Sequence, residues 1–175
     1  MATSLDQIAT YLERRELKFQ REDAKDMIVV PFRLDEIGAV MVVVRLEESG
    51  EFFKVFIPKL FTYQSGPHKA ALLQTLLLTS WETKMLQWEY DPSDGEVRAM
   101  VEFPLEDAPL TERQFFRAFD GLLHLSVRFH PRLKQVIESG EDPGRAEPGA
   151  GADSEWGAFL RGGGGDDGGG APDAL

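Results

Sequence analysis

Three strand-like segments within residues 27–58 constrain most strongly what this chain can fold into. They run from Met27 to Leu34, from Ala39 to Leu46 and from Glu51 to Pro58, and all are rich in β-branched and aromatic residues. Short polar breaks, DEIG and EESG, separate them. Breaks of this kind are typical of tight connections between neighbouring strands. The stretch therefore predicts three successive strands in an antiparallel sheet.

Both faces of this predicted sheet are apolar. Side chains alternate between the two faces along a strand. One face collects the residues expected in the core, which are Ile28, Val30, Phe32, Leu34, Val40, Val42, Val44, Leu46, Phe53, Val55 and Ile57. The opposite face carries Met27, Val29, Pro31, Met41, Val43, Phe52 and Phe56, with Arg33, Arg45 and Lys54 among them. Because a face in water should be mostly polar, we expect this second face to be covered.

Three kinds of cover are compatible with the sequence: a helix of the same chain, a second copy of the chain, or a bound segment of another protein. An extended segment could use pockets for its alternate side chains and could also pair with a strand edge. A later predicted strand, Glu96 to Leu105, has one face that is expected to lie in water, with Arg98, Met100 and Glu102 on it. The apolar second face is thus local, as a bounded contact surface would be. Its predicted contact residues are Met27, Val29, Met41, Val43, Phe52 and Phe56.

Two helices are predicted before and after these strands. The first begins at the N-terminus, where Ser4 and Gln7 have the spacing of a capping box. The second follows Pro67 and has the sequence HKAALLQTLLLTSW. Its leucines form a surface so broad that we expect burial on more than one side.

Two further strands and a last helix complete the domain. The strands, Lys84 to Tyr90 and Glu96 to Leu105, are joined by DPSDG, which favours a tight hairpin connection. The last helix begins at a capping box formed by Thr111 and Gln114, and Pro131 is expected to kink or restart it. The predicted order is α-βββ-α-ββ-α, an α+β fold with a five-stranded antiparallel sheet and flanking helices.

The composition changes after residue 140. Residues 141–175 are rich in Gly, Pro, Ala and Asp, so we predict a domain over 1–140 and a disordered, acidic, Gly-rich tail. Within the tail, one helical turn would bring together Trp156, Phe159 and Leu160. This tail motif is either a short linear motif that docks in a groove of a partner or a segment that folds back on its own domain.

The charge and the cysteine count exclude several classes of function. A net charge of −11 disfavours general binding to nucleic acids or to anionic membrane surfaces. The absence of cysteine excludes disulfides, thiolate nucleophiles and cysteine-based metal sites. The N-terminal residues lack the pattern of a secretory signal, and the apolar runs are too short to span a membrane. We therefore expect a soluble cytoplasmic protein.

Catalytic patterns are missing from the sequence. His124 and His130 lie six residues apart, which is not the spacing of a helical metal-binding pair, and His68 lies far from both in sequence. The DPSDGE stretch reads as a hairpin turn, because it lacks the alternating oxygen ligands of a calcium loop. No nucleophile elbow, Walker loop or dinucleotide-binding loop follows a strand. We predict a protein without enzymatic activity, metal or cofactor.

Several stretches together resemble a known family. They are LDQIATYLERRELKFQRE, the three hydrophobic strands, HKAALLQTLLLTSWETKMLQWEYDPSDGEVRAMVEFPLED and LTERQFFRAFDGLLHLSVRFHPRL. Over residues 5 to 138 the chain resembles the YbjN-like family, and through it the type III secretion chaperone-like superfamily. The tail has no counterpart in this pattern.

The resemblance implies a protein that acts without catalysis. Members of the chaperone branch often dimerise and hold a partner polypeptide in extended form over apolar patches, whereas the YbjN branch implies a sensory or regulatory role. Our first hypothesis is a peptide-binding or chaperone-like adaptor whose partner is another protein, an extended peptide or a second copy in a homodimer. The alternative is a regulatory or structural subunit that acts through Trp156, Phe159 and Leu160.

Overall fold

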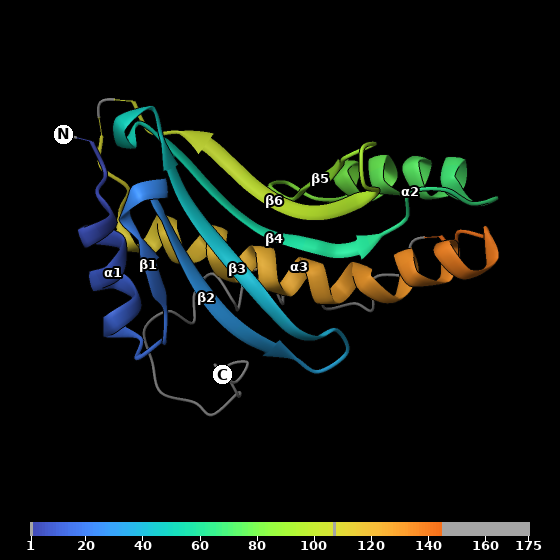
Figure 1. The fold of residues 1–175 in the computed structure, drawn as a ribbon, viewed down its shortest axis with the longest axis horizontal. Coiled ribbons are helices and arrows are strands. Elements are labelled where there is room, and N and C mark those ends of the chain that lie inside the picture. Colours follow the sequence, from blue (N-terminus) through green and yellow to red (C-terminus); the bar gives the residue numbers. More distant parts are fainter. Residues whose placement is uncertain (1, 107, 145–175) are drawn as a thin grey trace.

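The computed structural model describes residues 2–106 and 108–144 of the chain, and these form one antiparallel sheet and three α-helices (Figure 1). The helices are α1 (Leu5–Arg14), α2 (Lys69–Trp81) and α3 (Glu112–Ser139). The strands are β1 (Gln20–Glu22), β2 (Met27–Leu34), β3 (Gly38–Glu47), β4 (Phe52–Thr62), β5 (Gln87–Tyr90) and β6 (Glu96–Pro104). Their order across the sheet is β1-β2-β3-β4-β6-β5.

The α+β class and the antiparallel sheet agree with the prediction, but the predicted number of five strands is wrong. The sixth is β1, which pairs with the first residues of β2, Gln20 lying opposite Val29. A three-residue strand is too short to show a hydrophobic period, so the sequence did not reveal it. The next position of β2 on the same face is Pro31, whose missing N–H cannot extend the pairing.

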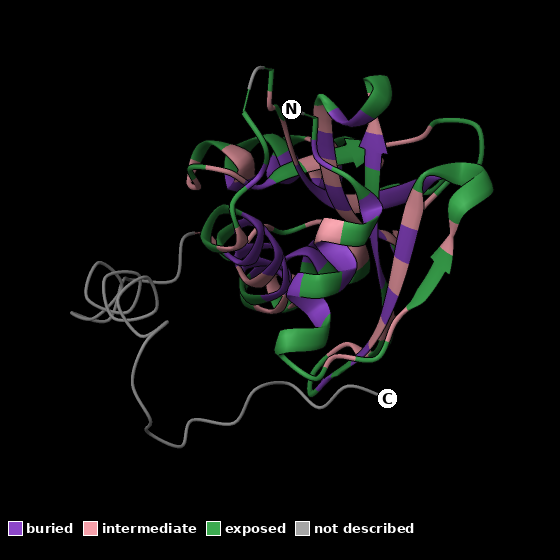
Figure 2. Ribbon diagram, turned by 90° about the vertical axis from the view of Figure 1, so that its left-hand side faces the viewer, coloured by how far each residue is buried: buried purple, intermediate pink, exposed green. Residues whose placement is uncertain are grey.

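The helices pack on one face of the sheet. Ile8 and Leu12 of α1 and Phe115 and Phe119 of α3 are buried in a single cluster with the core face of the strands, and α3 runs behind β2, β3 and β4 in Figure 1. Ten of the eleven residues predicted to face the core are buried, and Val40 is half-buried against the same cluster. Figure 2 shows buried bands alternating with less buried bands along the strands. The predicted alternation is therefore confirmed for the core face.

The two predicted capping boxes have different outcomes. At the start of α3 the box is complete: the N–H of Gln114 donates to Thr111 Oγ1 at 3.3 Å, and the N–H of Thr111 donates to Gln114 Oε1 at 3.0 Å. At the start of α1 the N–H of Gln7 donates to Ser4 Oγ at 3.2 Å. The Gln7 amide, however, donates to the carbonyl of Leu110 at 3.0 Å instead of completing the box. The side chain of Gln7 is thus used for a tertiary hydrogen bond in which it is the donor.

The last helix is continuous, which corrects the predicted restart at Pro131. α3 runs from Glu112 to Ser139 with Pro131 inside it. It ends where Gly140 adopts φ 77° and its N–H donates to the carbonyl of Val136. The packing of Phe129, Leu133 and Val136 on both sides of the proline holds the two halves in one helix.

An ion cluster joins α2, α3 and the chain that follows α3. Both terminal oxygens of Glu82 accept from Arg132 Nη1 at 3.0 Å, and Asp142 accepts from Arg132 at 2.7 and 2.9 Å. Thr75 Oγ1 donates to Asp142 at 3.3 Å. The Arg132 side chain is only 10% exposed, and its hydrogen bonds lower the pKa of the Asp142 carboxyl. Residues 140–142 are thereby fixed beside α2.

α2 is buried on one side only within the described chain. Leu72 and Leu76 are buried against Val97, Leu133 and Val136 in a second, smaller cluster. The outer side of the helix is exposed, so the expectation of burial on more than one side is not met by the described residues. Among these residues no helix is both long and apolar enough to cross a membrane.

Candidate protein-binding face

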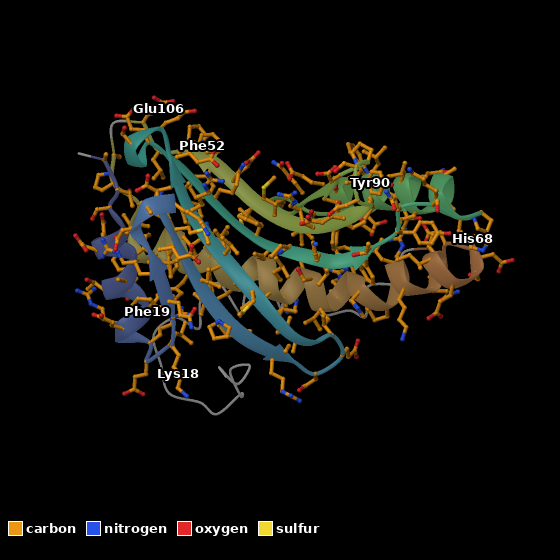
Figure 3. All side chains as sticks on the ribbon, in the orientation of Figure 1. Lys18, Phe19, Phe52, His68, Tyr90 and Glu106 are labelled. Carbon is orange, nitrogen blue, oxygen red and sulfur yellow. The ribbon has the colours of Figure 1, made fainter. Side chains whose placement is uncertain are left out.

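The second face of the sheet is left uncovered by the helices that the structure describes. We call it the open face. It carries the predicted contact residues Met27, Val29, Met41, Val43, Phe52 and Phe56, together with Pro31 and, from β6, Met100. None of these residues belongs to either of the two hydrophobic clusters in which the helices pack. Figure 3 shows side chains standing along the near side of the sheet, with Phe52 labelled towards one end.

Strand register arranges the centre of this face as a single row. Val29 lies opposite Val43, Val43 lies opposite Phe56, and Phe56 lies opposite Met100. Gln20 of β1 and Gln87 of β5 end the row on its two sides. We call Val29, Val43, Phe56 and Met100 the apolar row. It crosses four strands at right angles and, at about 4.8 Å per strand, is about 15 Å long.

Two members of the apolar row are buried although no described helix lies over them. Val43 is 8% exposed and Met100 is 1% exposed. Among the described residues they are the only buried hydrophobic residues outside both clusters. Met41, by contrast, is 50% exposed beside the row. The open face therefore combines two buried apolar side chains with an exposed one.

Paired charges border the apolar row on both sides. On one side Lys54 Nζ lies 3.1 Å from Glu102 and 3.8 Å from Glu47, and Arg45 lies 3.6 Å from Glu47. On the other side Arg98 lies 3.6 Å from Glu89 and 3.1 Å from Glu96. The Arg98 guanidinium also lies over the Phe56 ring, 5.8 Å from its centre. The border therefore consists of three basic and four acidic side chains that are paired with one another.

Only some of the predicted contact residues lie in the apolar row. Val29, Val43 and Phe56 lie in the apolar row, and Met41 lies next to it. Met27 lies opposite Arg45, and Phe52 lies opposite Glu47. These last two share the open face but stand among the paired charges. The tail motif, Trp156, Phe159 and Leu160, lies outside the described residues.

Sequence reasoning missed Met100, which it placed on a wet side of β6. Met100 enters the row because β6 pairs with β4, with Met100 opposite Phe56. These two strands are separated by α2 and β5 in the sequence, so periodicity within β6 could not reveal the neighbour. The only available signal was one large apolar residue between Arg98 and Glu102.

Two prolines interrupt the parts of β2 and β6 that β1 and β5 leave unpaired, while β1 and β5 themselves form the outer edges of the sheet. In β2 the N–H of Leu46 donates to the carbonyl of Asp26, so the even-numbered residues bond to β3 and Pro31 points outwards. In β6 the N–H of Leu105 donates to the carbonyl of Glu51, so Pro104 points away from β4. A proline has no N–H to offer an added strand. Strand pairing at these two positions is therefore disfavoured, whereas the outer edges of β1 and β5 contain no proline.

The histidines show no arrangement for chemistry. His130 stacks on Phe61 with the ring centres 4.8 Å apart, and burial lowers the pKa of its imidazole. The His68 backbone N–H donates to the hydroxyl of Tyr63. Within residues 2–106 and 108–144, no group of three His, Asp or Glu side chains is placed to hold a metal ion. The DPSDG stretch forms the predicted turn, in which the N–H of Asp91 donates to the carbonyl of Glu96.

Solved structures with this fold can be compared directly. No protein-family model matches the sequence, and no curated protein matches it. The fold is similar to that of YbjN, a candidate transcription regulator from E. coli, with a TM-score of 0.55, 9% identity, and coverage of 75% of this chain and 94% of that chain.

Two complexes also contain a similar chain. For the HopA1-SchA chaperone–effector complex, the TM-score is 0.50 with 14% identity, and the match covers 70% of this chain and 88% of that chain. For the ExsC-ExsE complex, the TM-score is 0.51 with 19% identity, and the match covers 71% of this chain and 89% of that chain. The chain therefore has the YbjN-like, type III secretion chaperone-like fold that the sequence predicts.

Proposed function

We propose that this chain is a chaperone-like protein-binding module that holds a segment of another protein on its open face. The observation that carries the proposal is the apolar row, which crosses four strands on a face that no described helix covers. Its action is non-enzymatic, as an adaptor or regulatory protein.

The row is suited to holding apolar side chains. Val43 and Met100 form a floor from which water is already excluded, and Met41 and Phe56 rise beside it. Three partner side chains fully buried there would contribute about 5–9 kcal/mol before the entropic costs of binding. This predicts reversible binding of a short segment.

The segment is expected to lie across the strands. The apolar row runs at right angles to them, whereas an added strand would run parallel to them at the edge of the sheet and would not cover the row. The paired charges on both sides would select partners with apolar residues in the centre and polar residues at the flanks.

The comparisons support this proposal through the fold. Two of the similar structures are complexes, one of which is described as a chaperone with its effector. A second copy of this chain is a further possible occupant of the open face. It would give a homodimer, and sedimentation of the purified protein distinguishes it from binding to a different polypeptide.

Selection from a displayed library of random peptides tests the proposal. The purified full chain is the bait, and selected peptides are then titrated calorimetrically against Phe56→Glu. We expect affinity to fall at least tenfold, which corresponds to about 1.4 kcal/mol, because a charge would interrupt the apolar row. The matched control, Arg33→Glu, changes an exposed residue of the same face outside the row and should leave affinity within twofold.

Two results would reject the proposal. One is a set of peptides that binds Phe56→Glu as tightly as the wild type. The other is binding that disappears in a Leu77→Gln, Trp81→Gln double variant while it persists in Phe56→Glu, because the peptides would then use α2.

A further inference from the structure

α2 carries a second apolar surface that the proposed function does not use. Leu77 is 75% exposed, Leu78 41% and Trp81 86%. With Met41 of the open face, they are the exposed large hydrophobic residues of the described chain. We call Leu77, Leu78 and Trp81 the α2 patch.

The three side chains of the α2 patch form one surface. Trp81 is four residues from Leu77 and three from Leu78, and residues at these spacings are neighbours on a helix. The opposite side of the helix, with Leu72, Leu76 and Thr79, is buried. Because an apolar cluster that includes a tryptophan is rarely left in water, the patch is a candidate docking surface.

The course of the chain after α3 indicates what could cover it. Gly140 turns the chain in the left-handed region, and Asp142 then binds Arg132 and Thr75. Thr75 lies six residues before Trp81 in α2, a distance of about 9 Å along the helix. The last described residues therefore lie within about two turns of α2 from the patch.

We propose that the tail motif of the same chain, Trp156, Phe159 and Leu160, docks on the α2 patch. The motif offers three large apolar side chains at helical spacing, and the patch offers three more. Gly144 is the last residue that the structure describes, and Trp156 comes 12 residues after it. The sequence between them is rich in Gly, Pro and Ala and contains no other aromatic residue.

Reach and concentration favour docking within one chain. A flexible coil of 12 residues has a root-mean-square span of about 17–21 Å, and its fully extended length is about 40 Å. Either value exceeds the distance from Asp142 to the α2 patch, which is on the order of 10 Å by helix geometry. A short tether of this kind gives an effective concentration of about millimolar, which is higher than that of a second copy in dilute solution.

Docking of the tail would regulate access to the α2 patch. A partner or a second copy that uses the α2 patch would first have to displace the tail, whereas the open face would stay available. This goes beyond the proposed function, since it assigns an occupant to a different surface.

Paramagnetic relaxation in the full chain tests the inference. Because the chain has no cysteine, Ala158→Cys provides a single site for a nitroxide within the tail motif, between Trp156 and Phe159. In a ¹⁵N-labelled protein we expect broadening of the amide signals of Leu77 to Trp81. The broadening should be unchanged on dilution and should be lost when Trp156, Phe159 and Leu160 are replaced by serine in the labelled chain.

Three outcomes would overturn it. The first is broadening of the α2 amides that appears only in a mixture of two proteins, one carrying the nitroxide at natural nitrogen abundance and the other carrying ¹⁵N without a nitroxide. Such broadening would indicate docking between copies. The second is broadening centred on Val43 and Met100 of the open face. The third is broadening of α2 that persists in the Leu77→Gln, Trp81→Gln variant, which should reduce it at least threefold if the patch is the dock.

Discussion

Adjacent residues of β4 should respond in opposite ways to the same substitution. Val55 is completely buried in the main core cluster, and Phe56 is half-buried on the open face. We predict that Phe56→Glu folds and that Val55→Glu does not. The pair tests directly whether the sheet has one closed and one open face.

The expected magnitudes follow from burial. Full burial of a phenylalanine contributes about 1.5–3 kcal/mol, so loss of the half-buried Phe56 ring should cost about 1 kcal/mol. The new carboxylate would reach water and lie near Arg98, which now stands over the ring. At Val55 the carboxylate would have no water, and burying an ion costs several kcal/mol. Added to overpacking of about 1–3 kcal/mol, this approaches the total stability of about 5–15 kcal/mol typical of a domain.

Urea unfolding monitored by circular dichroism measures the difference. Phe56→Glu should keep a cooperative transition with a slightly lower midpoint, and Val55→Glu should show no cooperative transition. Equal stability of the two variants, or loss of folding in Phe56→Glu alone, would refute the assignment of the faces.

Two further predictions concern the α2–α3 junction and the response to pH. Arg132→Ala leaves the partly buried carboxylates of Glu82 and Asp142 unpaired, so it should lower the free energy of unfolding in urea by about 3–5 kcal/mol. The control, Arg14→Ala, removes a largely exposed pair with Glu112 and should cost less than about 1 kcal/mol. Equal effects of the two variants would contradict the structural role of the ion cluster. For His130, burial followed by the charge of Lys134 lowers the pKa in the folded state, against a smaller opposite effect of Glu36. The unfolded chain therefore binds more protons below its pKa of about 6.5, so this contribution to stability is complete above that pH and is lost as the pH falls below it. His130→Phe, which can keep the stacking on Phe61, should flatten the pH dependence of the unfolding midpoint between about pH 7 and 5, and an unchanged profile would show that His130 is not responsible.

Local periodicity predicted the architecture where each strand carries its own signal. The alternation in residues 27–58 separated Val55 from Phe56 and placed the core face correctly. It failed for β1, which is too short to show a period, and for Pro131, where packing of the flanking turns overrides the local preference for a break.

For the candidate site, the sequence likewise predicted which face a residue lies on but not which residues are neighbours across strands. Val29, Val43 and Phe56 could be assigned to one face from the sequence, but their alignment in a row depends on register. Met100 joins them only through pairing of β4 with β6, which is a long-range property. The exposed position of Trp81 likewise depends on which side of α2 meets α3, and a helix rich in leucine on all sides does not specify that side.

Photocrosslinking from the open face inside cells tests the central claim most directly. A photoreactive phenylalanine analogue at Met41, which projects beside the apolar row, is compared with the same analogue at the exposed Arg117 on α3. We predict a covalent adduct with another polypeptide from position 41 that is absent from position 117 and is lost when Phe56→Glu is added. Equal adducts from both positions, or an adduct from position 41 that survives Phe56→Glu, would contradict a binding role for the open face.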